Sequence, residues 1–434
     1  MSEKDLKEKV ENLLMENLVT GYSKSQEVEY TFIKPSSNRY SYQYFWDTCF
    51  HVYILCAIDK SDLAKKCFKT LFAMQEESGF VGHIHYWNNV YPARITDIFQ
   101  NKVSLGRDLL RTHMSSLIQP PLVAQTLQKI WETTKDRDYL EEMLPKIKKY
   151  FEWLSRNRDF DDDGLLSIIS PFESGMDWKA SYDPVLGFSH GKANKLLFWK
   201  VVGIDFRNFW RNYDQQKIRR RDKFRIEDAG FNTIYAQNLK ALGDLCNIME
   251  DRDAAKYKDR YKKVKDSILK LMYDEPDAAF YDLYSEKNKK LRILTPTIFF
   301  PVIIDGMPDD VHKKVMERHF FNENEFHTKY PIPSLAINDP AFNPHESMYI
   351  WRGPTWIFNN WFMHQFMLEK GYNEEARHLI DAIVNLVDKS GFREYYNPFN
   401  GEGYGARNFT WAGLVLDMIQ MHESHTNEKF DKGT

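Results

Sequence analysis

Four segments of the chain combine carboxylates or amides with aromatic side chains. They are residues 40–47, 171–178, 351–356 and 394–411. A sugar is apolar on its ring faces and carries hydroxyls around its rim, so its binding site needs flat aromatic walls beside hydrogen-bond donors and acceptors. One aromatic cluster by itself is more often core than pocket. Four such segments together indicate a carbohydrate site.

The composition limits the classes of protein to be considered. The chain has 434 residues, of which 43% are hydrophobic and 28% charged, so it is not disordered and can bury a large core. Aromatic residues reach 15%, with 30 Phe, 24 Tyr and 11 Trp. The net charge of −3 gives no overall attraction to nucleic acid or to an anionic membrane, so we expect neither as a partner. Partners must be sought in local features.

Neither a metal nor a redox site is expected. The four cysteines lack CxxC spacing and are predicted to be buried thiols. Residues 159–164 resemble the start of a calcium loop, but Ser170 stands where that loop needs a glutamate. His83 and His85 have no identifiable third ligand partner. The charged N-terminus lacks a secretory signal and no apolar run could span a bilayer, so a cytoplasmic protein is expected.

Hydrophobic periodicity predicts helices along almost the whole chain. Helical hairpins are expected near residues 46–58 with 62–77, 121–134 with 138–156, 231–249 with 261–271, and 356–369 with 374–387. Pro145 is expected in the first turn of a helix, Gly371 at a helix C′ position and Asn373 at an N-cap. The best alternating stretch, 80–86, is short, so an α/β sheet is not expected. Repeated hairpins suit an α-solenoid or a closed ring, and the lack of a fixed-period repeat favours the ring.

Six motifs carry a resemblance to a known family. They are PSSNRYSYQYFWDTCFH at 35–51, IQPPL at 118–122, DDDGLLSIISPFESGMDW at 161–178, FRIEDAGFNTIYAQNLKAL at 224–242, WRGPTW at 351–356, and EYYNPFNGEGYG with NFTWAG at 394–413. In this order they resemble the glycoside hydrolases with an (α/α)6 toroid, the group that includes trehalases, and most closely the family 63 branch with glucosylglycerate and mannosylglycerate hydrolases. The resemblance implies an all-α fold of six helical hairpins with long active-site loops. It also implies one catalytic domain over 1–434, with a short N-terminal extension and a polar C-terminal tail.

The same resemblance assigns the catalytic pair. Asp177 would be the general acid and Glu394 the general base of an inverting reaction. Such a reaction needs one carboxyl group protonated and one ionised, about 6.5–9.5 Å apart so that a water fits between base and sugar. Glu394 therefore needs nearby donors to stay charged. Glu173 and Glu402 are the alternatives, but we expect Glu173 to fix its loop and Glu402 to lie in a turn.

The remaining candidates are sugar-binding side chains. The resemblance assigns them as Tyr40, Trp46, Asp47, Gln119, Trp351, Arg352, Trp356 and Trp411. Asp47 would accept sugar hydroxyls and Trp46 would form a wall. The alternative for each is packing or loop support, and Arg352 could instead bind carbonyl groups at a helix end.

Two departures from the family pattern leave the substrate open. Trp178-Lys179-Ala180 follows the acid where the family usually has Asn-Ser-Pro, and Ile350 replaces a usual tyrosine. A glycerate-bearing substrate would need a cation, which the basic cluster 219–225 could supply; a solvated basic loop is the alternative.

The expected function is hydrolysis, without a cofactor, of a small α-linked glucoside or mannoside, including those of glyceric acid. A trehalase-like or α-glucosidase activity and a catalytically silent sugar-binding protein are the alternatives.

Overall fold

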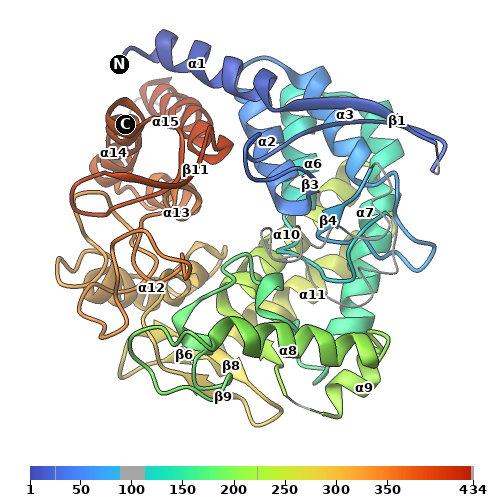
Figure 1. Ribbon diagram of the computed structural model, residues 1–434. Helices are drawn as coiled ribbons and strands as arrows, with labels where there is room; N and C mark the ends of the chain where they lie inside the picture. The colour runs from blue at the N-terminus through green and yellow to red at the C-terminus, as the bar shows by residue number, and fades with distance from the viewer. Residues whose placement is uncertain (25, 88–112, 222, 432–434) are drawn as a thin grey trace.

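The computed structural model describes residues 1–24, 26–87, 113–221 and 223–431. Helices dominate this part of the chain and form a ring around a central axis (Figure 1). They are α1 (Glu3–Glu16), α2 (Phe45–Ala57), α3 (Ser61–Leu71), α6 (Val123–Thr134), α7 (Arg137–Arg158), α8 (Leu197–Trp210), α9 (Gln215–Arg219), α10 (Ala229–Ile248), α11 (Ala254–Ser267), α12 (Asp309–Val315), α13 (Ile357–Glu369), α14 (Asn373–Ser390) and α15 (Leu414–Asp431).

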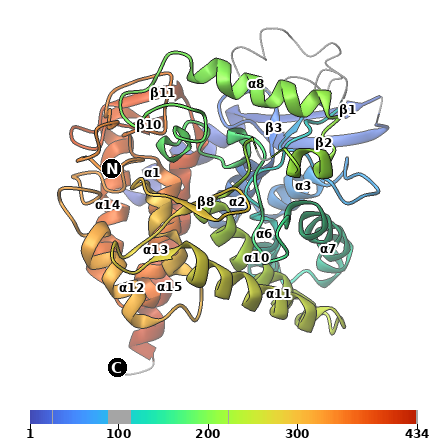
Figure 2. The same cartoon turned by 90° about the horizontal axis from the view of Figure 1, so that it is seen from below.

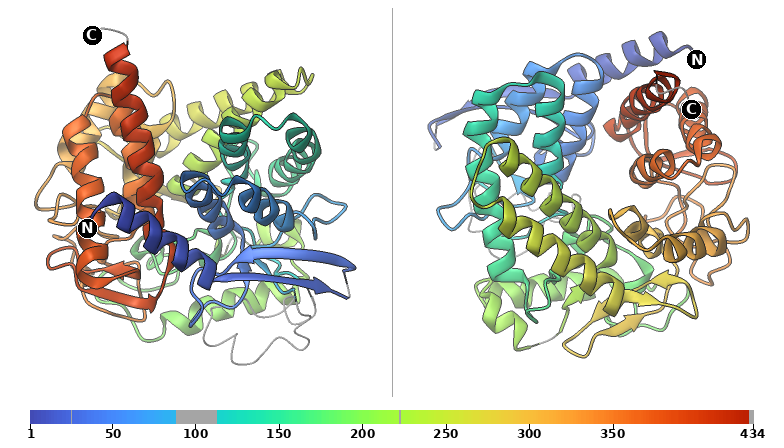
Figure 3. Two further views of the ribbon diagram at one scale, coloured as in Figure 1. Left: turned by 90° about the horizontal axis from the view of Figure 1, so that it is seen from above. Right: turned by 180° about the vertical axis from the view of Figure 1, so that it is seen from behind.

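The ring closes through consecutive contacts between inner elements. Helix α2 packs on α6, α6 on α10, α13 on α15, and α15 returns to α2. Helices α3, α7, α11 and α14 pair with inner helices from the outside, as Figure 3 shows from two further directions. The closed (α/α)6 toroid expected from the sequence is therefore confirmed.

One inner position of the ring departs from a full helix. Between α10 and α13 the chain forms two short 3-10 turns, Pro296–Ile298 and Phe300–Ile303, which contact both neighbours. Each turn has a proline in its first or second position, where a proline is tolerated, and Pro301 prevents the first turn from continuing into the second as one helix. Helix α12 packs outside them.

The predicted hairpins occur, with local corrections at their ends. Pro145 lies inside α7, because Asp136 caps the helix earlier by accepting the backbone N–H of Tyr139 at 3.0 Å. Gly371 has φ +83° just beyond α13, as predicted, whereas Asn373 is the first residue of α14 and not its cap.

The strands are short and arranged as hairpins or pairs. They are β1 (Leu18–Ser23), β2 (Val28–Ile33), β3 (Gln43–Tyr44), β4 (Ile84–His85), β5 (Ile226–Glu227), β6 (Tyr273–Asp274), β7 (Ala279–Phe280), β8 (Asp282–Tyr284), β9 (Lys289–Leu291), β10 (Arg393–Tyr396) and β11 (Gly403–Arg407). Of the predicted stretch 80–86 only β4 is a strand, paired with β3. The antiparallel pair of β10 and β11 lies at the same end of the toroid as α8 (Figures 2 and 3).

One hydrophobic cluster extends through the described chain, from Leu6 in α1 to Ile419 in α15. All four cysteines are buried thiols, as predicted. Within the described ranges, no helix is both long and apolar enough to cross a bilayer.

Candidate active site

A cavity with an empty volume of about 600 Å³ brings the four aromatic segments together. Its lining includes nine of the ten residues selected from the sequence, namely Tyr40, Trp46, Asp47, Gln119, Asp177, Trp351, Trp356, Glu394 and Trp411. It also includes Ile350, one of the two departures from the family pattern. The other departure, Trp178, is buried against Phe172 and Tyr349 and is not part of this lining.

Glu394 is held by three hydrogen-bond donors. It lies on β10 and is only 2% exposed. One carboxylate oxygen accepts the hydroxyl of Tyr40 at 2.6 Å, and the other accepts the guanidinium of Arg39 at 3.0 Å and the backbone N–H of Ala406 at 2.8 Å. Donors of this kind favour the ionised form of a buried carboxyl group. The expected requirement for donors around Glu394 is thus met.

Tyr40 is a donor in this arrangement. Burial of its hydroxyl raises its pKa well above the ordinary value, and the charge of Glu394 adds to the shift. The phenol therefore keeps its proton and points it at the carboxylate.

Gly405, on the neighbouring strand β11, allows this close approach. Its φ is +67°, and a Cβ atom there would lie 2.5 Å from the carboxylate Oε2 of Glu394 and 2.6 Å from the ring of Tyr395. Both the backbone conformation and the space exclude a side chain. The Gly-Tyr-Gly run of β11 thus brings the chain directly against Glu394.

The loop carrying Asp177 approaches the cavity in a similar way. Gly175 has φ +74°, and a Cβ atom there would meet the ring of Trp46 at 2.4 Å. Ser174 accepts the N–H of Met176 at 3.0 Å and closes the turn. Asp177, half-buried, follows at the cavity wall.

The two alternative carboxylates have other roles. Glu173 is fully buried and forms a two-pronged ion pair with Arg158, with both N···O distances 2.6 Å. It also accepts the backbone N–H groups of Ile118 and Ile169. Glu402 is exposed and accepts the hydroxyl of Tyr404 at 2.8 Å. Both observations agree with the loop and turn roles expected for them.

Asp47 adds a third carboxyl group to the cavity. It lies in the first turn of α2 and accepts the indole N–H of Trp411 at 2.8 Å. Burial raises its pKa to about 7; the Trp411 hydrogen bond opposes this shift, and the charges of Glu394 and Asp177 add to it. Asp47 therefore titrates near neutral pH.

Aromatic rings form the walls of the cavity. Trp351 stacks on Trp356 with a centroid separation of 3.7 Å, and Trp46 meets Trp411 edge to face at 5.4 Å. The side-chain oxygen of Gln119 accepts the backbone N–H of Trp46 at 3.1 Å, which leaves the amide NH₂ as its donor group.

Arg352 requires a correction. Its guanidinium is 2% exposed and forms a two-pronged ion pair with Asp183, at 2.7 and 2.5 Å. Arg352 is not among the described residues that line the cavity, and within the described ranges its guanidinium donates to Asp183 and not to the helix-end carbonyls of the alternative. An arginine paired in this way holds two loops together instead of meeting a sugar.

The basic cluster also lies elsewhere. Within the described part of the chain, no residue of 219–225 belongs to the cavity lining, and Arg225 pairs with Asp161. Arg39, which is not part of the cavity lining, instead contacts Glu394 from outside it, and sequence reasoning missed this contact. The available signal was its position directly before Tyr40, in a motif already assigned to the site.

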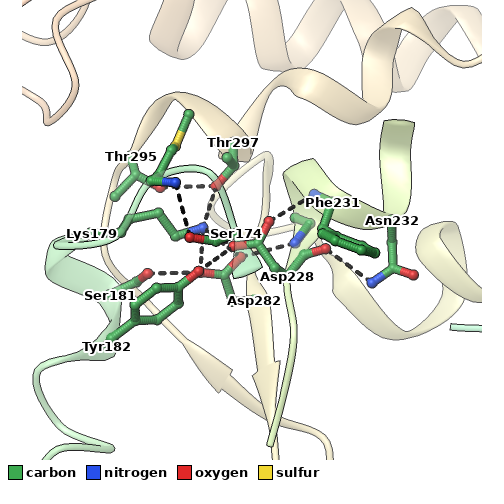
Figure 4. Close-up of polar contacts among 12 residues, drawn as sticks. Ser174, Lys179, Ser181, Tyr182, Asp228, Phe231, Asn232, Asp282, Thr295 and Thr297 are labelled. Atoms are coloured by element: carbon green, nitrogen blue, oxygen red, sulfur yellow. Dashed lines mark hydrogen bonds and ion pairs between the residues drawn. The ribbon is translucent and has the colours of Figure 1, made fainter. Parts of the chain in front are cut away.

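Behind the acid loop lies a buried network centred on Lys179 (Figure 4). The fully buried ammonium group contacts Asp228 and Asp282, the latter at 2.8 Å, and Thr297 at 3.0 Å. Tyr182 donates to Asp228 at 2.7 Å, and Asp228 caps α10. The segment after Asp177 is thereby tied to α10 and β8.

The fold and this cavity define the class of protein. A toroid of helical hairpins with facing acidic and aromatic side chains at one end is the architecture of an (α/α)6 glycoside hydrolase. The family model of the mannosylglycerate hydrolase MGH1-like glycoside hydrolase domain matches residues 40–412. The chain belongs to this family and is a glycoside hydrolase, as the sequence motifs predicted.

Relatives with assigned activities cover nearly the whole chain. It is 25% identical over 408 residues to a mannosylglycerate hydrolase of Thermus thermophilus, a match that covers 88% of this chain and 95% of the relative. It is 26% identical over 428 residues to a glucosylglycerate hydrolase of Mycolicibacterium hassiacum, with 88% and 92% covered. Among solved structures, a family 63 mannosylglycerate hydrolase of Thermus thermophilus in complex with Tris and D-glycerate has a TM-score of 0.81 at 23% identity, with 96% of this chain and 100% of that chain covered.

Proposed function

We propose that this protein hydrolyses a small α-linked glucoside or mannoside with inversion, and that glycosides of glyceric acid are its first candidate substrates. The observation that carries the proposal is the presence in one cavity of Asp177 and of Glu394 with its three donors. The named activities of the relatives support the choice of glycerate glycosides.

The residues divide the reaction between them. Glu394, held by hydrogen bonds from Arg39, Tyr40 and the Ala406 N–H, removes a proton from the attacking water. Asp177 gives its proton to the glycosidic oxygen as the bond to the anomeric carbon breaks. Water attacks from the face opposite the leaving group, so one displacement inverts the anomeric configuration.

The other cavity residues bind the sugar. The rings of Trp46, Trp351, Trp356 and Trp411 supply flat apolar walls. Asp47 and Gln119 supply polar groups for the hydroxyls at the rim of the sugar. Tyr40 serves the base through its hydroxyl. Arg352 is left out of this set because Asp183 occupies its guanidinium.

The experiment is a substrate panel with stereochemical readout. Purified protein is incubated with glucosylglycerate, mannosylglycerate, trehalose and α-glucobioses, and the anomer released first is followed by proton NMR. We expect the β-anomer from an α-glycoside of glyceric acid. First release of the α-anomer would disprove inversion, and turnover of trehalose alone would replace the glycerate proposal with the trehalase-like one.

Two variants test the roles of the carboxyl groups. Asp177→Asn and Glu394→Gln are expected to lower kcat by at least about 10²-fold while the fold is kept. Glu402→Gln is the matched control, since this glutamate is exposed in the same motif and lies outside the cavity lining. Wild-type rates in both active-site variants would disprove the mechanism. A wild type that turns over nothing but gains thermal stability with a glycoside would instead indicate a silent sugar-binding protein.

We also infer a single catalytic domain in a reducing cytoplasm. The continuous hydrophobic cluster supports the first point and the four buried thiols support the second.

A further inference from the structure

A stripe of exposed apolar side chains runs along α8, outside the cavity. It consists of Leu196, Trp199, Phe206 and Trp210, which are 58%, 61%, 47% and 71% exposed. With 3.6 residues per turn these positions fall within an arc of about 80° on one side of the helix. Phe206 and Trp210 contact each other edge to face at 5.7 Å, so part of the stripe forms a continuous aromatic surface. We call these four residues the α8 stripe.

The stripe is not the face by which α8 joins the protein. Leu197, Val201 and Ile204 are buried on the other side and belong to the main hydrophobic cluster. An ordinary surface helix has one apolar stripe toward the core and a polar outer face. Helix α8 has apolar residues on both faces, so its outer face is suited to a partner.

The charge around the stripe is strongly positive. Residues 192–225 contain eleven lysines and arginines against three aspartates, a net charge of +8 in a chain whose net charge is −3. Lys195, Lys200 and Arg207 are exposed beside the stripe, whereas Asp205 of the same helix is buried. The surface therefore complements a partner that is apolar and anionic at once.

A second copy of this chain fits the charge poorly. If two α8 stripes packed against each other about a twofold axis, Lys200 and Arg207 of one copy would face the same basic residues of the other. Like charges at such close range oppose the contact. An anionic bilayer instead offers a negative surface above an apolar interior, and tryptophan side chains favour the boundary between the two.

We propose that the α8 stripe and its basic border bind the surface of a bilayer that contains anionic lipids. The expectation of no membrane partner rests on the charge of the whole chain, whereas this region has the opposite sign. Because α8 lies at the same end of the toroid as the β10 and β11 pair, which carries Glu394, the bound enzyme turns its cavity end toward the membrane (Figure 2). The inference is independent of the substrate.

The test is co-sedimentation of the full chain with vesicles. The probes are vesicles of phosphatidylcholine alone and vesicles in which three of every ten lipids are phosphatidylglycerol and the rest phosphatidylcholine. We expect binding to the anionic vesicles at least tenfold stronger than to the neutral ones, weakening as salt increases, together with a blue shift of tryptophan fluorescence.

Variants locate the contact. Trp199→Ser combined with Trp210→Ser is expected to lower the partition coefficient at least tenfold, and Lys200→Gln combined with Arg207→Gln to lower it severalfold. Tyr22→Ser is the matched control, since Tyr22 is 56% exposed on β1, away from α8, and its loss is expected to leave binding unchanged.

Three outcomes would overturn the proposal. The first is absence of binding to anionic vesicles by folded wild-type protein. The second is binding that the double tryptophan variant keeps in full. The third is a dimer, detected by analytical ultracentrifugation, that the double tryptophan variant turns into a monomer, because the stripe would then be an interface between copies.

Discussion

Replacing Gly405 by alanine should disable the base without removing it. The added Cβ would lie 2.5 Å from Oε2 of Glu394. Ordinary contacts begin at about 3.5 Å, so the carboxylate must move by about 1 Å. Since a misplacement of about 1 Å at a reacting group costs about 10²-fold in rate, we expect kcat to fall by about that factor, or about 2.7 kcal/mol of transition-state stabilisation.

A matched variant separates this effect from backbone strain. Gly391 has φ +72°, close to the +67° of Gly405, but a Cβ atom there meets nothing within 4 Å. Both alanines are expected to lower folding stability by about 1–3 kcal/mol, because a positive φ disfavours a Cβ atom and Gly391, with ψ −170°, has a backbone conformation that is essentially confined to glycine. Only Gly405→Ala should lower kcat strongly.

The assay is steady-state kinetics on the substrate found in the panel, with unfolding measured on the same preparations. The reasoning would be refuted if Gly405→Ala kept the kcat of Gly391→Ala. In that event either Glu394 is not the base, or the β11 backbone does not determine its position.

Three other predictions concern charged groups outside the acid and base. Arg352→Met should lower folding stability by about 3–5 kcal/mol, because Asp183 is left buried without its partner, and KM should stay unchanged in the folded fraction. A raised KM with unchanged stability would show instead that Arg352 binds the sugar. Lys179→Met should lower folding stability by a similar amount at pH 8 and by less at pH 5, because Asp228 without the ammonium group takes up a proton more readily in the folded protein. A loss of folding stability that does not change with pH, measured by denaturant unfolding, would contradict this. Burial raises the pKa of Asp47 to about 7, so KM should rise as pH falls through 7 and the neutral carboxyl replaces the carboxylate, and Asp47→Asn should remove this dependence. The raised pKa also means that ionised Asp47 destabilises the folded state above pH 7. Asp47→Asn should therefore be more stable than wild type at pH 8, and this difference should shrink as the pH falls toward the pKa of about 4 that an aspartate has in the unfolded state. Measurements of KM and of unfolding across pH 5–9 test both points.

The hairpins and most of the cavity could be predicted because they depend on local patterns. Amphipathic periodicity predicted the hairpins of α2 with α3 and of α13 with α14, and most of the predicted helix ends lie within a few residues of the observed ones. The motif residues at the cavity share segments in which aromatic and acidic side chains are close in sequence, so their grouping was visible before the fold was known.

The errors arise where a partner far along the chain determines the outcome. Arg352 looked like a sugar ligand because its own motif is aromatic, but its partner Asp183 is 169 residues away. The role of Arg39 likewise depends on Glu394, 355 residues further on. The replacement of one inner helix by 3-10 turns has a local cause instead, because Pro301 separates the two turns, which the apolar pattern alone does not reveal.

The bond between Trp411 and Asp47 joins residues 364 positions apart and bears on how the protein is made. During synthesis the segment with Asp47 leaves the ribosome long before Glu394 and Trp411 do. Contacts at such long separation form late, because the loop they close is costly in entropy. A nascent chain that has just completed α11 therefore carries Asp177 and the first tryptophan wall but has no base, so the catalytic centre arises only after Glu394 and Trp411 have been synthesised.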